Sequence, residues 1–261
     1  MRTLAIGCLT TALLASLAFG QTPAAPGVDR VFYFTHTDNP QNLQEIVNIV
    51  RAMNDSTATL DRSKKTLSVH GTSAQIALVE WLLSEMDRPA TVAPSPAPAV
   101  HPNGNNRGVD QVVRVFSLAY AETPLSLQEL TNLLRSLISM QRVFPYNALK
   151  LLVASGSADQ MAVAEWLVQQ VDRPPGPPVR DAGTRDIQWT FKIMHTVRVF
   201  YLTHDQSPQE IQGIISQLRS ATKVDHIAPY SAQHAIAVAG TADQMAAVAR
   251  LVKELDQAPL R

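Results

Sequence analysis

The chain has almost no cysteine. Its single one, Cys8, lies so near the N-terminus that it falls within a segment with the features of a secretory signal peptide. Cleavage of that segment leaves a mature protein without cysteine. This excludes a disulfide scaffold, a thiolate metal site and a cysteine nucleophile. An exported protein of this kind has to be stabilised by its apolar cores.

The signal peptide is predicted from its three regions. Arg2 provides a positive charge, the run that follows is mostly apolar, and Ala18 and Gly20 place small side chains before the cleavage site. We assign residues 1–20 to the signal peptide and 21–29 to an N-terminal spacer. The run is too short for a membrane anchor, which needs about 20 apolar residues. We therefore expect a periplasmic protein, or one exported further, without an integral membrane span.

An excess of charge of either sign is also missing, because 22 basic residues balance 22 acidic ones. No global field would attract a nucleic acid. The chain lacks the Gly-x-Ser-x-Gly turn, the phosphate-binding loop and the His-Glu-x-x-His helix. His36 and His204 occupy matching positions but form incomplete ligand sets, and His226 and His234 are expected to face each other across a hairpin. We predict no catalytic activity, metal, cofactor or nucleic-acid partner.

What the chain does contain is one sequence pattern written three times. GTSAQIALVEWLLSEMDRP begins at Gly71, and related segments begin at Gly156 and Gly240, at a spacing of about 84 residues. Upstream of each segment, an apolar run alternates in the manner of a β-strand and a helical stripe follows it. Two further strands and a second helix complete each copy. The predicted unit is therefore βαββα.

The helix starts are predicted from capping boxes, in which a small polar residue precedes a Glu or Gln by three residues. For the first helix of each copy the expected starts are Asn42, Ser126 and Ser207. For the second helix they are Thr72, Ser157 and Thr241.

The predicted fold class is α+β, with three tandem modules joined by Pro-rich linkers. The modules occupy residues 30–88, 112–173 and 187–257, and the linkers occupy 89–111 and 174–186. Linkers of this composition are semi-extended spacers. We therefore expect three independent small domains, each with its own core.

The third module includes an extra strand at 187–193, because Ile187, Trp189, Phe191 and Ile193 alternate with polar residues. No counterpart is expected ahead of the first two modules. Two interpretations remain open. The strand extends a sheet within the chain, or it is offered to a neighbouring chain by edge addition.

Aromatic and arginine positions give the candidate interaction residues. Trp81 and Trp166 share one position in the second helix, where the third copy has Arg250. These side chains are either partly buried in their own module or anchor a contact between modules or subunits. Trp189 and Phe191 complete the set. Three further arginines beside the first strand are interpreted as edge charges that discourage strand aggregation: Arg30, Arg114 and Arg198.

The unit resembles the small periplasmic N-domain of bacterial secretins, the N1-type or NolW-like domain. The resemblance is carried by VRVFYLTHDQSPQEIQGIISQL and AIAVAGTADQMAAVARLVKELD. It implies a KH-like fold used for protein–protein contact, in domains that build stacked periplasmic rings. The few residues after Asp256 contain no counterpart of the secretin barrel domain, so we expect an accessory protein.

These observations predict a non-enzymatic periplasmic interaction and assembly protein. Its expected partners are copies of itself or secretin- or pilus-type envelope proteins. The alternative is a monomeric envelope module that binds a peptide or a glycan through exposed sheet edges or the strand at 187–193.

Overall fold

The computed structural model describes residues 27–54, 56–90, 99–102, 111–121, 123–174, 184–188, 194–203 and 207–256. The predicted signal peptide, Trp189 and Phe191 lie outside these residues, as do parts of the predicted spacer and linkers.

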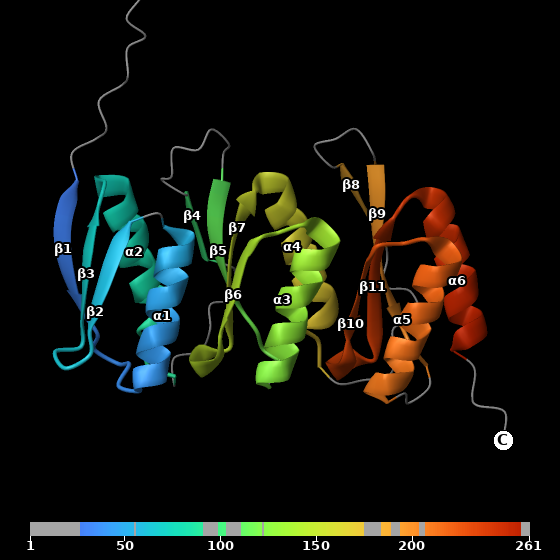
Figure 1. Cartoon of the computed structure of the whole chain (residues 1–261), viewed down its shortest axis with the longest axis horizontal. Coiled ribbons are helices and arrows are strands. Elements are labelled where there is room, and N and C mark those ends of the chain that lie inside the picture. Colours follow the sequence, from blue (N-terminus) through green and yellow to red (C-terminus); the bar gives the residue numbers. More distant parts are fainter. Residues whose placement is uncertain are drawn as a thin grey trace, which may run out of the picture.

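The first module has the predicted order of strands and helices. Its antiparallel sheet has the strand order β1-β3-β2, and both helices cover one face of it (Figure 1). The elements are β1 (Val28–Tyr33), α1 (Pro40–Met53), β2 (Thr57–Asp61), β3 (Thr66–Gly71) and α2 (Ser73–Met86).

The second and third modules repeat this unit and add a fourth strand, which pairs with the outer edge of the unit's first strand. Their sheets have the orders β4-β5-β7-β6 and β8-β9-β11-β10. The chain is thus an α+β protein with three βαββα modules in tandem, as predicted. The second module comprises β4 (Ala99–Pro102), β5 (Gln111–Ser117), α3 (Pro124–Ile138), β6 (Arg142–Tyr146), β7 (Leu151–Ser157) and α4 (Ala158–Val171). The third comprises β8 (Thr184–Gln188), β9 (Met194–Tyr201), α5 (Pro208–Thr222), β10 (His226–Tyr230), β11 (Ala235–Gly240) and α6 (Ala242–Leu255).

The fourth strands correct two expectations. β8 begins at Thr184, three residues before the predicted strand, and pairs with β9 of its own module. The expectation that the second module lacks a counterpart is wrong, because β4 pairs with β5 from Ala99↔Val115 to Pro102↔Val112. β4 lies within the predicted linker 89–111, whose Pro-rich composition indicates a spacer and not a strand. An edge strand tolerates a proline that a central strand does not.

Helix capping also differs from the prediction in part. The side chains that cap α1 and α3 belong to Asn39 and Thr123, three residues before the predicted positions, and only Ser207 of α5 was placed correctly. Pro40 and Pro124 explain the difference, because proline favours the first helical position, where its missing N–H costs nothing. The predicted capping boxes of the second helices are confirmed, with Thr72, Ser157 and Thr241 as caps.

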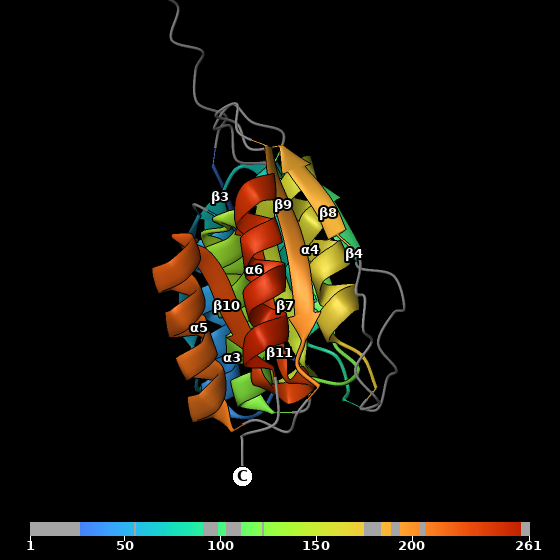
Figure 2. The same ribbon diagram turned by 90° about the vertical axis from the view of Figure 1, so that its right-hand side faces the viewer.

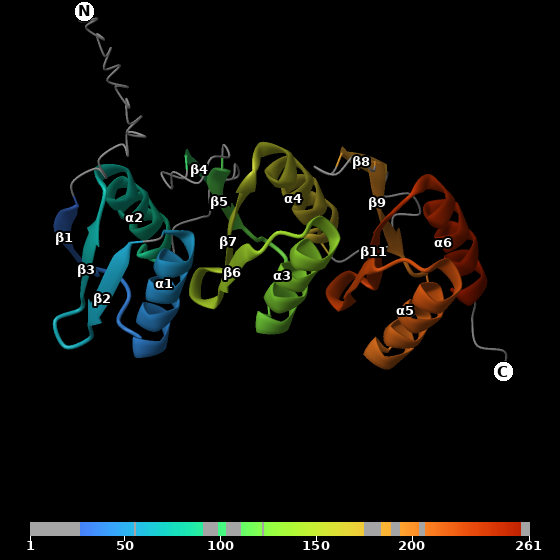
Figure 3. The same ribbon diagram turned by 45° about the horizontal axis from the view of Figure 1, so that its top comes forward.

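The three modules form one continuous stack. Sheets and helix pairs alternate along the long axis (Figures 1 and 3). α1 packs against β6 and β7 of the second module, and α3 packs against β10 and β11 of the third. Two apolar clusters each join the helices of one module to the sheet of the next. The expectation of independent domains with separate cores is therefore wrong.

A second apolar stripe on the helices is the physical reason for this stacking. Besides the residues that face their own sheet, α2 buries Leu78 and Leu82, and α4 buries Val163 and Leu167. A helix that is apolar on two sides has to be covered on both. The helical stripe predicted from the sequence accounts only for the side that faces the module's own sheet.

Candidate interaction surface

The second and third sheets have helices on both faces. On the face towards the preceding module, both sheets bury two valines of their first strand: Val113, Val115, Val197 and Val199. Hydrogen bonds also cross this contact. The hydroxyl of Tyr201 donates to the carbonyl of Gln170 at 2.5 Å, and the N–H of Ser231 donates to the Glu129 carboxylate at 2.8 Å. The contact between a sheet and the preceding helix pair is thus a protein interface built within one chain.

Two tyrosines are fully buried at these contacts. Tyr146 faces the first module and Tyr230 faces the second. Burial raises the pKa of the Tyr146 hydroxyl, and a hydrogen bond with Thr37 partly opposes this effect. Burial likewise raises the pKa of Tyr230, and nearby carboxylates add to the shift. Packing of the stack therefore favours the neutral hydroxyl.

The same face of the first sheet is not covered by any described residue. Val31 and Tyr33 of β1 are 50% and 73% exposed, whereas Val115 and Val199, the counterparts of Val31, are each 2% exposed. We call this surface the first-sheet face. Its residues are Asp29, Val31, Tyr33, Thr57, Thr59, Ser68 and His70. It is the surface that binds helices in the other two modules, left open here.

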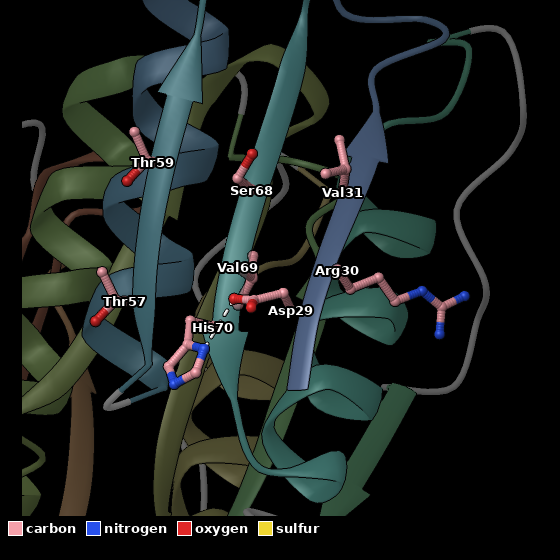
Figure 4. A pocket seen from close by; sticks show the side chains of 8 residues that line it. All are labelled: Asp29, Arg30, Val31, Thr57, Thr59, Ser68, Val69 and His70. Carbon is pink, nitrogen blue, oxygen red and sulfur yellow. Dashed lines mark hydrogen bonds and ion pairs between the residues drawn. The ribbon is translucent and has the colours of Figure 1, made fainter. Parts of the chain in front are cut away.

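The rest of the first-sheet face is polar. Thr57, Thr59, Ser68 and His70 are side chains of β2 and β3, and the His70 Nδ1 atom lies 2.8 Å from a carboxylate oxygen of Asp29 (Figure 4). With neighbouring side chains they line a shallow depression of about 360 Å³. Hydroxyl and imidazole groups on the central and outer strands, beside Val31 and Tyr33 on the edge strand β1, are typical of a hydrated, reversible protein contact.

An aspartate that follows the second helix positions the loop after the first strand. The Asp87 carboxylate accepts hydrogen bonds from the N–H groups of Thr35, His36 and Thr37 at 2.6, 3.0 and 2.8 Å. Burial acts to raise the pKa of Asp87, but the hydrogen bonds outweigh it and lower the pKa below its usual 3.8. Asp172 and Asp256 hold the equivalent loops through Ala119, Tyr120, Ala121 and Thr203. These acids lie far from their partners in the sequence, so no local pattern predicts the hydrogen bonds.

The candidate residues on the second helices lie along the stack and at its end. The ring of Trp81 lies 5.2 Å from that of His101 on β4 of the second module. Trp166 packs against the apolar cluster shared by the second and third modules, and Arg250 of α6 is exposed. The position thus carries tryptophan where another module follows and arginine where no described module follows. Trp189 and Phe191 lie outside the described residues.

The repeated arginines connect the first strand to the second helix. Arg30 donates to Glu80 at 2.9 Å, and Arg114 donates to Glu165. Arg114 and Arg198 lie on β5 and β9, whose outer edges are occupied by β4 and β8. The interpretation of these two residues as charges that protect a free edge is therefore wrong.

Two histidines lie within hydrogen-bond distance of main-chain carbonyls. The Nδ1 atom of His36 lies 3.1 Å from the carbonyl oxygen of Asp87, and that of His226 lies 2.6 Å from the carbonyl oxygen of Ser136. His226 and His234 do not face each other, because they lie at opposite ends of β10 and the turn after it. Within the described ranges, no three potential ligands gather around a point where a metal ion could bind. None of the helices described has the length and apolar character needed to cross a membrane.

Comparison with known proteins gives matches among solved structures. No protein-family model and no curated protein matches the chain. It is similar to ExeD of Aeromonas hydrophila, with 18% identity, a TM-score of 0.21 and coverage of 88% of this chain and 41% of that one. The N-terminal domain of the secretin XcpQ from Pseudomonas aeruginosa has 17% identity and a TM-score of 0.24, and the match covers 57% of this chain and 63% of that one. The ETEC pilotin–secretin complex AspS–GspD has 15% identity and a TM-score of 0.22, with coverage of 89% of this chain and 38% of that one.

This chain spans less than two thirds of each of these three chains. The matches are secretins or their N-terminal domains, the family named from the sequence resemblance.

Proposed function

We propose that this chain is a non-enzymatic interaction protein of the bacterial envelope, accessory to a secretion- or pilus-type assembly, and that it docks its partner on the first-sheet face. The observation that carries the proposal is the exposure of Val31 and Tyr33 on a face whose two counterparts bind helix pairs. The periplasmic location rests on the predicted signal peptide. The secretin-type setting rests on the resemblance of the modules.

The shape of the first-sheet face favours a folded protein partner. Its depression is shallow, and its polar groups are spread over three strands instead of converging on one point. Small-molecule sites are typically deep and enclose most of their ligand. A helix pair matches the surface better, because the same face of the second and third sheets already accommodates one.

A monomeric peptide-binding module is the second candidate, and one observation favours it. The outer edge of β1 pairs with no described strand, whereas the corresponding edges of β5 and β9 carry β4 and β8. An extended peptide can add to such an edge through main-chain hydrogen bonds. No comparable observation in the described chain favours a glycan.

Site-specific photo-crosslinking tests the proposal. Benzoylphenylalanine replaces Tyr33 in the full chain, expressed in its native host, and crosslinked products are identified by mass spectrometry. The matched control carries the same group at Leu125, which is 65% exposed and lies outside the first-sheet face. We expect a discrete protein adduct from position 33 that position 125 does not give. Identical adducts at both positions, or none at position 33, would contradict the proposed docking face.

A further inference from the structure

The opposite end of the stack presents a second uncovered face. α5 and α6 form its last layer and lie foremost in the view along the long axis (Figure 2). A groove of about 280 Å³ is lined by five of their residues, which we call the end-helix face: Gln217, Ser220, Ala221, Leu251 and Leu255. No described residue beyond these helices covers it.

In the first two modules, the corresponding helix positions are buried by the next sheet. Gln217 and Ala221 are exposed, whereas their counterparts on α1 and α3 are fully or almost fully buried: Ile49, Met53, Leu133 and Leu137. On the second helices the apolar character is kept. Leu251 corresponds to Leu82 and Leu167. The end-helix face therefore has a polar half on α5 and an apolar half on α6.

The first-sheet face is divided in the same way. Within the stack, α3 packs against β10, the counterpart of β2, while the end of α4 accepts a hydrogen bond from Tyr201 of β9, the counterpart of β1. On the first sheet, β2 presents Thr57 and Thr59, whereas β1 presents Val31 and Tyr33 together with Asp29, whose carboxylate pairs with His70. If the two end faces met as the internal ones do, the polar residues of β2 would lie against α5, and Val31 and Tyr33 of β1 would lie against α6.

We propose that the partner of the first-sheet face is the end-helix face of a second copy of this chain, so that copies join head to tail. The inference rests on the proposed function and names its partner. The contact continues the packing that already joins each module to the next. The Tyr33 hydroxyl takes the role of its counterpart Tyr201 and donates to the main-chain carbonyl of Glu254, the counterpart of Gln170.

The polarity of the contact determines its strength and its extent. Because half of it is polar, it buries less apolar surface than the internal contacts and is weaker and reversible. Because the two surfaces differ, it leaves one free face at each end of a dimer, and the assembly grows unless it closes into a ring.

Sedimentation of the exported chain with two end-blocking variants tests this geometry. Tyr33→Arg blocks the first-sheet face and Ala221→Arg blocks the end-helix face. Both residues are exposed, so the fold should be kept. We expect the mass of the wild type to rise with concentration beyond a dimer, and each variant alone to be a monomer. An equimolar mixture of the variants should form dimers and nothing larger, because each supplies the end that the other lacks.

The control is Leu125→Arg, which changes an exposed apolar residue outside both end faces and should keep wild-type assembly. A wild type that stays monomeric at every concentration, or a mixture that does not dimerise, overturns the head-to-tail contact. If the crosslinker at position 33 then captures a different envelope protein, the proposed function stands and only the partner named here is wrong. If both blocked variants assemble as the wild type does, neither face is the contact.

Discussion

At the scale of single residues, the aspartate that follows each second helix has a structural role that the sequence did not predict: its carboxylate holds the loop after the first strand. A carboxylate that accepts three main-chain N–H groups is favoured in its charged form. In the first module these groups belong to the loop between β1 and α1, so Asp87 joins the two ends of the module. Its contribution to stability should therefore depend on pH.

Asp87→Ala should lower the free energy of unfolding by about 2 kcal/mol near neutral pH, because hydrogen bonds to a charged group contribute about 1.5–3 kcal/mol. The folded pKa of Asp87 lies below 3.8. Its contribution is therefore full above that value and is lost as the pH falls through the folded pKa. Urea titrations of wild type and variant at pH 7 and at several values below 3.8 measure this difference. An equal difference at all pH values would contradict the role of the charge.

Asp159→Ala is the matched control for this series. Asp159 is exposed in the first turn of α4, where the helix dipole favours a negative charge by about 0.3–1 kcal/mol. Its removal should change the free energy of unfolding by less than that of Asp87.

A second feature at this scale is a turn in which a residue other than glycine adopts the left-handed backbone conformation. Lys65, Lys150 and His234 occupy equivalent turns with φ of 52°, 52° and 48°. This conformation costs a residue with a Cβ roughly 1–2 kcal/mol. Lys150→Gly should therefore raise the free energy of unfolding by about 0.5 kcal/mol, after the greater entropy of glycine in the unfolded chain is subtracted. Lys150→Val should lower it. Paired urea titrations measure both signs, and the same sign for both variants would contradict the argument.

At the scale of helices and strands, much of the architecture could be predicted from periodicity. The order βαββα and the capping boxes of the second helices follow from local signals, and the structure confirms them. The fourth strand β4 could not be found this way, because its four residues are too few for an alternation to be read. Short edge strands are fixed by the neighbour they pair with rather than by their own pattern.

The open face of the first sheet did leave a signal in the sequence. The third strands of the later modules, LLVAS and AIAVA, are continuous apolar runs, which are typical of a strand buried on both faces. The corresponding TLSVH alternates, as a strand buried on one face does. A comparison of the repeats with one another would therefore have predicted both the stacking and the uncovered first sheet. The expectation of separate domains did not account for this difference.

Trp81 gives a prediction at this scale, because its helix position holds one module on the next. Trp81→Arg introduces the residue that α6 carries at position 250 and removes the ring contact with His101. We expect the free energy of unfolding to fall by about 1–3 kcal/mol, which lies within the usual range for a destabilising substitution. Arg250→Ala should change it by no more than about 0.5 kcal/mol, as expected of an exposed residue. Thermal unfolding followed by circular dichroism measures both, and equal effects would contradict a role for Trp81 between modules.

At the scale of the whole molecule, the chain is a short repeat protein whose end modules differ from the pattern inside. Stacked repeats bury a continuous core only where each has a neighbour, so the terminal repeats need more polar outer faces. Here the first-sheet face is more polar than the same face of the other two sheets. On the other end, α5 has Gln217 and Ala221 where α1 and α3 have large apolar residues. In the proposed head-to-tail assembly, both changes would limit uncontrolled growth and leave Val31, Tyr33 and the leucines of α6 for a weaker contact.

The polar residues that α5 carries on the end-helix face can be transferred to α3 of the second module. A chain that ends at residue 174 lacks the third sheet and uncovers Leu133 and Leu137 of α3, both fully buried in the complete chain. We expect it to self-associate and to bind a hydrophobic dye, because the uncovered area is large and apolar. The double variant Leu133→Gln with Leu137→Ala carries the residues that α5 has at the same positions. It should return the shortened chain to the weak association proposed for the full-length protein.

Leu130→Gln with Leu134→Ala provides the contrast. These positions correspond to Ile214 and Leu218, which stay buried in the third module although no described module follows it, so they face their module's own sheet. Their replacement should unfold the shortened chain, since loss of a buried leucine costs about 2–5 kcal/mol. Sedimentation and circular dichroism separate the two results. If both double variants had the same effect, the two sides of the helix would not serve different sheets, and the stack would not be built from interchangeable contacts.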